Sequence, residues 1–167
     1  MIEQQLTTVV FLPLLALKHL LASRCRGLGL TYHVFDNQAI PLQILLALPE
    51  DLDDGGSVLE SYLKALHADN RLSWIIIDEC HMTNEHKVFR NVLCLLAKLR
   101  TTQLPIPLVL LSATAPPQAV PKLKETYACF DLEEVRDETE RMNLCYKVEP
   151  VDTCNDILGQ VIEFVTN

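Results

Sequence analysis

The chain has 167 residues, of which 49% are hydrophobic and 22% are charged, and its formal net charge at pH 7 is -8. This composition excludes an intrinsically disordered chain and predicts a globular domain with a substantial core. The acidic balance argues against an autonomous nucleic-acid binder, because phosphate backbones favour basic surfaces. It still permits a domain that contributes a few contacts within a larger assembly.

Cysteine usage and hydropathy favour an intracellular protein. The chain has 6 cysteines, and none belongs to a C-x-x-C pair or a disulfide framework. Cys80, His81, His86 and Cys94 match no standard zinc spacing. No apolar run reaches the roughly 18 residues that a membrane span needs, and the first residues lack the basic cluster of a signal peptide. We therefore expect no contact with a membrane.

Predicted strands and helices alternate from the start of the chain. Residues 7–12 (TTVVFL) are apolar on both faces, which is typical of a strand buried inside a parallel sheet. A helix with apolar residues at helical spacing follows over residues 14–27, and Gly27 or Gly29 is expected to end it. Two more strands are predicted next, over residues 31–35 and 42–48.

A second helix is predicted after the turn-rich segment at residues 51–56 (DLDDGG). Ser57 and Glu60 have the spacing of a capping box, in which two side chains satisfy backbone N–H groups at the helix start. The expected buried stripe of this helix has four members: Val58, Tyr62, Leu63 and Leu66.

The second half of the chain continues the alternation. Residues 74–78 (WIIID) give the strongest strand signal, and residues 86–100 follow with the spacing of a helix. Residues 108–111 predict another strand, and the Pro116–Pro117 pair starts a helix that runs to about residue 128. The remaining predictions are a polar linker at 131–140, a strand at 143–148 and a helix at 156–165.

Together these elements predict an α/β fold, a mostly parallel sheet with helices on both faces. The strands at residues 7–12, 74–78 and 108–111 are apolar on both faces, so we expect them to be inner strands.

Two adjacent carboxylates, Asp78 and Glu79, follow the strand at residues 74–78. Ligands bind at the carboxyl ends of strands in open parallel sheets. One carboxylate there can hold Mg²⁺, and the other can orient or deprotonate a water. A bare Asp-Glu pair also fits a solvated turn, but an apolar strand followed by Asp-Glu-x-His is far more specific.

Ser112, Ala113 and Thr114 end the next predicted strand. Alone, Ser-Ala-Thr fits an ordinary turn. It gains weight because it lies one helix and one strand after Asp78.

In this order the motifs resemble those of superfamily-two helicases, and among them the RecQ-like family. DECH at 78–81 is similar to motif II, the Walker B element, and SAT at 112–114 is similar to motif III. Pro13 and Leu14 open a segment (PLLAL) similar to motif Ia. Weaker similarities cover most of the rest: CRGLG at 25–29, LPE at 48–50, FR at 89–90, PP at 116–117 and RMNLCYKV at 141–148.

The resemblance implies a RecA-like, P-loop NTPase-type domain of an ATP-dependent DNA helicase that moves 3′ to 5′, in the nucleus if the source is eukaryotic. It implies that Asp78 binds the Mg²⁺ of MgATP and that Glu79 is the catalytic base. His81 would couple the nucleotide site to motif III.

The same resemblance implies how hydrolysis reaches DNA. Ser112, Ala113 and Thr114 would transmit hydrolysis to unwinding. Pro13 and Leu14 would lie near the track of single-stranded DNA.

The chain also departs from the family. A phosphate-binding loop needs G-x-x-x-x-G-K-[ST], and no glycine here precedes a lysine. The loop after His81 (MTNEHKV) lacks the aromatic residues that RecQ-like proteins usually place there, so the similarity does not extend to the DNA-sensing role of that loop. We expect a motor domain truncated at its amino terminus that does not hydrolyse ATP alone.

We expect residues 1–135 to form the partial motor domain, and residues 136–167 to form a linker and the start of a second motor domain. The strand at residues 7–12 is expected to be an exposed edge that promotes self-association, because its missing neighbour would carry the phosphate loop. Two alternatives remain: a non-enzymatic α/β interaction module derived from a helicase domain, and an unrelated doubly wound protein with a chance DECH.

Overall fold

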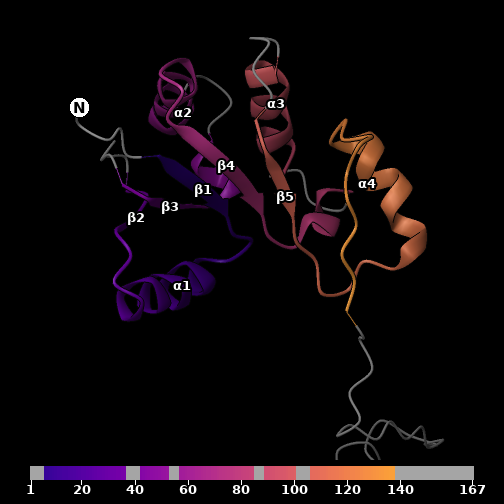
Figure 1. The fold of residues 1–167 in the computed structure, drawn as a ribbon, viewed down its shortest axis with the longest axis horizontal. Coiled ribbons are helices and arrows are strands. Elements are labelled where there is room, and N and C mark those ends of the chain that lie inside the picture. Colours follow the sequence, from indigo (N-terminus) through magenta and orange to yellow (C-terminus); the bar gives the residue numbers. More distant parts are fainter. Residues whose placement is uncertain (1–5, 37–41, 53–56, 85–88, 101–105, 138–167) are drawn as a thin grey trace, which may run out of the picture. The chain divides into compact units, whose positions relative to one another are not determined.

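The computed structural model describes residues 6–36, 42–52, 57–84, 89–100 and 106–137. The chain divides into two compact units, Met1–Glu134 and Val135–Asn167, and the described helices and strands belong to the first (Figure 1). The predicted loop over 53–56, strand over 143–148 and helix over 156–165 lie outside the described residues.

The first unit contains a five-stranded sheet with the strand order β2-β3-β1-β4-β5, and every pair of neighbours is parallel. The strands are β1 (Thr7–Phe11), β2 (Tyr32–Val34), β3 (Ile44–Ala47), β4 (Leu72–Ile77) and β5 (Leu108–Leu110). The predicted α/β class with a parallel sheet is therefore confirmed.

Four helices accompany the sheet: α1 (Leu15–Gly27), α2 (Val58–Ala68), α3 (Phe89–Arg100) and α4 (Val120–Thr126). Short 3-10 segments occupy Pro49–Asp51, Cys80–Asn84 and Pro117–Ala119. Figure 1 shows α1 on one face of the sheet and α2 and α3 on the other. Helices therefore cover both faces, as the sequence predicted.

Right-handed crossovers explain this distribution. The chain moves from β1 through α1 towards β2 in one direction, and from β3 through α2 to β4 in the opposite direction. Because parallel crossovers are right-handed, opposite directions place their helices on opposite faces. The strands β1 and β4 are neighbours, and the connections that follow them therefore lead to opposite faces of the sheet.

Local sequence signals set the end of α1 and the start of α2 as expected. Gly29 follows α1 with a φ of +70°, and the N–H of Leu30 bonds the carbonyl of Cys25 at 3.0 Å. This left-handed closing turn favours glycine. At the start of α2, Ser57 Oγ accepts from the N–H of Glu60 at 3.1 Å.

The predicted stripe of α2 was wrong at its first position. Val58 is 48% exposed, and Leu59 is buried in its place beside Leu63 and Leu66. Val58 directly follows the cap at Ser57, so its position in the first turn points it away from the sheet.

The two faces of the sheet differ in their cores. On the α2–α3 face, Phe11, Leu45, Ile75 and Ile77 of the strands are buried against the helices. The helices contribute a large cluster: Leu59, Leu63, Leu66, Val92, Leu95, Leu96, Leu123 and Tyr127. On the α1 face the fully buried cluster is small: Val10, Leu12, Ala22 and Leu46.

Strand placement corrects two predictions. β1 lies in the middle of the sheet, paired with β3 and β4, so it is not an exposed edge. β5 pairs with β4 and is the edge strand of the described sheet rather than an inner strand. Apolar residues on both faces of a strand predict helices above and below it, but they carry no information about the strands beside it.

Candidate functional site

The carboxyl ends of β1 and β4 form the place where a doubly wound sheet binds ligands. The two strands are neighbours, and their connections lead to opposite faces. A crevice forms outside the strand ends at such a switch point. Pro13 and Leu14 follow β1 there, and Asp78 and Glu79 follow β4.

The backbone ties Asp78 into this edge. Its N–H donates to the carbonyl of Phe11 at 3.0 Å, across from β1. Its Oδ1 accepts the N–H of Glu79 at 3.0 Å. The carboxylate therefore lies at the strand end and also lines a pocket next to α1.

Glu79 has an unusual backbone, with a φ of 49°. Asn70 and Ala128 also have positive φ, but each directly follows the C-cap of a helix, where such a turn is ordinary. Glu79 instead follows a strand. A left-handed conformation costs a non-glycine residue roughly 1–2 kcal/mol, and such strain concentrates at functional sites.

The Glu79 side chain is about a third exposed, but its Oε2 atom is buried. Among the described residues, Oε2 has no hydrogen-bond partner. It lies 3.3 Å from Nδ1 of His81, a contact that becomes an ion pair only when Nδ1 carries a proton.

His81 joins the loops after β4 and β5. Its Nδ1 lies 2.8 Å from Ser112 Oγ, and its Nε2 lies 3.4 Å from Thr114 Oγ1. The ring is therefore within hydrogen-bond distance of the SAT segment, to which the family resemblance implies that it is coupled. Ala113, between the two hydroxyl residues, is exposed.

Backbone pairing brings these loops together. The N–H of Cys80 donates to the carbonyl of Leu111 at 2.9 Å, which fixes Ser112 beside the DECH turn. Asp78 and Ser112 therefore lie at the same carboxyl edge of the sheet, because β4 and β5 are parallel neighbours.

The Cys80 thiol is not a candidate nucleophile. It is 2% exposed, and burial, reinforced by the charge of Glu79, raises the pKa of the thiol to about 11. At pH 7 it is therefore protonated, and thiols attack or bind metals only as thiolates. Within the described ranges, no group of three or more His, Cys, Asp or Glu side chains is placed to hold a metal ion.

Asp78 and Glu79 nevertheless fit the needs of a nucleotide-bound Mg²⁺. This ion usually keeps several waters and binds through one or two carboxylates together with phosphates. The Asp78 carboxylate at the strand end matches such an incomplete set, and the buried Glu79 oxygen, which has no hydrogen bond among the described residues, stays available to a water.

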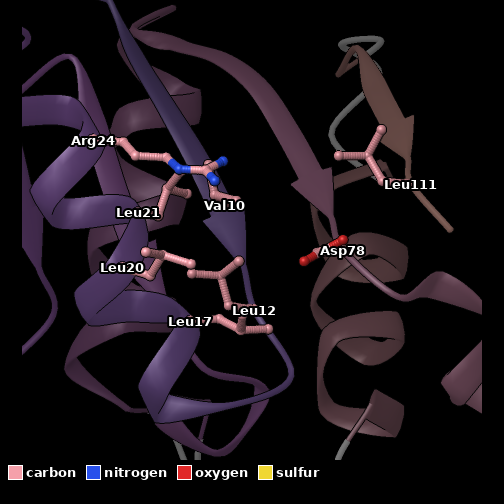
Figure 2. A pocket seen from close by; sticks show the side chains of 8 residues that line it. All are labelled: Val10, Leu12, Leu17, Leu20, Leu21, Arg24, Asp78 and Leu111. Atoms are coloured by element: carbon pink, nitrogen blue, oxygen red, sulfur yellow. The ribbon is translucent and has the colours of Figure 1, made fainter. Parts of the chain in front are cut away.

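An apolar pocket of about 210 Å³ adjoins Asp78 (Figure 2). Leu17, Leu20 and Leu21 line it from α1, with the other lining residues Val10, Leu12, Arg24, Asp78 and Leu111. Arg24 and Asp78 come from opposite walls. Sequence reasoning missed Arg24, although its spacing from Leu20 and Leu21 places the three on one helix face.

Sequence reasoning also missed Lys18, which is 3% exposed. Its Nζ lies 3.2 Å from Asp51 Oδ2 and 3.4 Å from the carbonyl of Phe35. The ion pair ties α1 to the segments that follow β2 and β3. A signal was available, because Lys18 interrupts the apolar stripe at Leu14, Leu17 and Leu21.

Pro13 and Leu14 lie at the same edge of the sheet, at the end of the central strand. Pro13 is half-buried, whereas Leu14 is 60% exposed as the N-cap of α1. An exposed leucine beside the crevice is available to a ligand.

Comparison of the chain with protein-family models and with curated proteins gives no match. In the part of the chain that the structure describes, no helix combines the length and the apolar character needed to cross a membrane.

Proposed function

We propose that this chain is part of the first motor domain of a RecQ-like, ATP-dependent DNA helicase. One observation carries the proposal: His81 contacts both Ser112 and Thr114, at 2.8 and 3.4 Å. A motor must link the site of hydrolysis to a second loop that changes position. The ring of His81 lies 3.3 Å from Glu79 Oε2 after β4 and contacts the hydroxyl residues after β5, so it stands between the two loops.

In this proposal the carboxylates divide the work at the strand ends. Asp78 holds the Mg²⁺ that accompanies ATP, and this ion neutralises phosphate charge when bound. Glu79 accepts a proton from the attacking water, since its Oε2 has no hydrogen bond among the described residues. His81, Ser112, Ala113 and Thr114 pass the change at the nucleotide to the rest of the motor.

The DNA contact in this proposal lies at the end of β1. Pro13 and Leu14 flank the crevice, and the exposed Leu14 offers an apolar surface to unstacked bases. A nuclear location in a eukaryote belongs to the same proposal.

The sequence has no G-x-x-x-x-G-K-[ST] segment, so the 167-residue chain lacks the usual backbone cradle and lysine for β- and γ-phosphates. We therefore expect no useful hydrolysis by this chain alone. Phosphate release should be measured with Mg²⁺, with and without single-stranded DNA, beside a Glu79→Gln variant. Turnover that disappears in the variant would contradict the expectation and reveal an unidentified phosphate site.

A second experiment tests the helicase proposal itself. The 5′ end of the transcript should be mapped and the complete product expressed. An in-frame G-K-S/T loop, with DNA-stimulated hydrolysis that Glu79→Gln abolishes, would support the proposal. A transcript without such a loop would favour the second candidate.

That second candidate is a non-enzymatic α/β interaction module derived from a helicase domain. The apolar pocket next to Asp78 favours it, because leucines rather than phosphate ligands line most of its wall. In that case the pocket would receive an apolar side chain of a partner.

A further inference from the structure

We propose that Ser112 is a positioning residue: its hydroxyl fixes the tautomer of His81 and thereby keeps the imidazole from donating a hydrogen bond to Glu79 Oε2. The meaning of this arrangement for catalysis rests on the function proposed above. The tautomer itself rests only on the hydrogen bonds of the two loops, and it can be measured without any ATP hydrolysis.

The hydrogen bonds at Ser112 leave its hydroxyl one role. A serine hydroxyl has one hydrogen to donate and two lone pairs to accept. Two backbone N–H groups already donate to Ser112 Oγ, from Thr114 at 3.3 Å and from Ala115 at 3.1 Å. Both lone pairs are therefore used. The contact of 2.8 Å with His81 Nδ1 must then be donated by the hydroxyl and accepted by the ring.

This direction of donation determines which ring nitrogen of His81 carries the proton. A neutral imidazole has one N–H donor and one bare nitrogen acceptor. If Nδ1 accepts from Ser112, the proton resides on Nε2. Nε2 has a matching acceptor, because Thr114 Oγ1 lies 3.4 Å away. Ser112 thus donates to Nδ1 of the ring, and Thr114 accepts from Nε2 of the same ring.

The tautomer explains the isolation of Glu79. Its Oε2 lies 3.3 Å from Nδ1, but Nδ1 is directed at Ser112 Oγ, 2.8 Å away. In the assigned tautomer Nδ1 carries no hydrogen, so it donates nothing to Oε2. This agrees with the lack of any partner for the buried Oε2 among the described residues. A carboxylate oxygen that receives no donor can still accept a hydrogen bond from a water.

Loss of the Ser112 hydroxyl should reverse this state. Without the hydroxyl, Nδ1 has no donor, and a rotation of the ring in the alternative tautomer brings an N–H towards Glu79 Oε2, 3.3 Å from Nδ1 in the wild type. A hydrogen bond to a charged acceptor is roughly twice as strong as a neutral one, so this tautomer becomes favourable. Glu79 would then be occupied by His81 rather than available to a water.

The experiment is two-dimensional ¹⁵N–¹H NMR of the histidine rings in the intact chain. Spectra are recorded near pH 8.5, where histidine imidazoles are generally neutral, and His81 is assigned by its loss in His81→Gln. We expect a pyridine-type Nδ1 and a pyrrole-type Nε2 in the wild type. Ser112→Ala should shift Nδ1 to pyrrole type, whereas Ser112→Thr, which restores a hydroxyl, should keep the wild-type pattern.

Two further variants separate this proposal from a general loss of structure. Thr114→Val removes the acceptor at Nε2 and should leave Nδ1 pyridine-type. Adding Glu79→Ala to Ser112→Ala removes the new acceptor and should return the ring to the Nε2-protonated form. A pyrrole-type Nδ1 in the wild type overturns the proposal even if Ser112→Ala does not fold. So does an unchanged ring in a folded Ser112→Ala variant.

Failure of the tautomer assignment and failure of the helicase proposal give different results. The NMR pattern reports the direction of one hydrogen bond, whereas phosphate release by the complete product reports the function. If the wild-type ring has the expected tautomer but the complete product does not hydrolyse ATP, the positioning role of Ser112 stands. The role of Glu79 as the base for ATP hydrolysis is then refuted.

Discussion

Helices bury the side chains of the strands more completely on one face of the sheet than on the other. On the α2–α3 face, Leu45, Ile75 and Ile77 are at most 1% exposed beneath the two helices. On the opposite face α1 is the one helix among the described residues that covers the strands, and Trp74 of β4 and Leu111 after β5 remain 45% and 47% exposed. One face has a closed core, and the other has a core that ends halfway across the sheet.

This difference identifies where the molecule is open to other molecules. Parallel sheets normally bury both faces, so an uncovered half is a departure with consequences. The pocket beside Asp78 is lined by Leu17 of α1 and also by Leu111, which follows β5 (Figure 2). The candidate site therefore adjoins the less complete side of the core.

The largest expected effect tests the comparison directly, with one substitution made on each face. Leu45→Ala on the closed face should lower the free energy of unfolding by about 2–5 kcal/mol, because it leaves a cavity in a buried cluster. Leu111→Ala should lower it by less than about 1 kcal/mol, since half of that side chain already contacts water. Urea unfolding measures both values.

Equal losses in the two variants would contradict the comparison. They would mean that Leu111 is covered in solution, for example by a second molecule. Repeating the measurement at several protein concentrations separates these cases, because coverage by a second copy makes the stability depend on concentration.

A smaller effect is expected at the ion pair that anchors α1. Lys18→Met removes the cation and leaves Asp51, which is 23% exposed, without this partner. We expect a loss of about 1–3 kcal/mol, reduced from the cost of a fully buried pair because water reaches the carboxylate. Urea unfolding again provides the measurement.

The matched control is Lys64→Met, which breaks an ion pair with Glu60 within α2. Lys64 is 50% exposed and Glu60 is 8% exposed, so Lys64→Met removes a half-exposed cation where Lys18→Met removes a buried one, and we expect the smaller loss for Lys64→Met. Adding Asp51→Asn to Lys18→Met should recover part of the loss. If Lys18→Met proves no worse than Lys64→Met, the α1 face is held by its apolar contacts alone.

Much of this arrangement was predictable from periodicity. The strands β1 and β4 followed from apolar runs, whereas the contact of His81 with the SAT segment was expected from the resemblance of DECH and SAT to helicase motifs. The order of the strands did not follow, because a sequence that is apolar on both faces is compatible with a central strand and with an edge strand. β5 illustrates this, since its sequence is as apolar as that of β1 but it has one neighbour in the described sheet.

Other features depend on three-dimensional contacts that a linear pattern does not contain. Lys18 is buried because Asp51 and the carbonyl of Phe35, both distant in sequence, meet its Nζ. The positive φ of Glu79 has no signal in its residue type. The direction of the Ser112 hydrogen bond emerges only when all donors around its oxygen are counted.

The smallest expected effect on stability is also the most informative about the open face. Trp74→Ser combined with Leu111→Ser replaces two half-exposed apolar side chains, so the free energy of unfolding should change by less than about 1 kcal/mol. Self-association should fall, because contiguous apolar surface promotes contact between copies. Light scattering over a range of concentrations provides the measurement, with Val58→Ser, at a 48% exposed site on α2, as the control. If the wild type is a monomer at every concentration, the open face does not drive association. If the double variant associates as strongly as the wild type, the contact lies elsewhere, and the edge of β5 becomes the next surface to test.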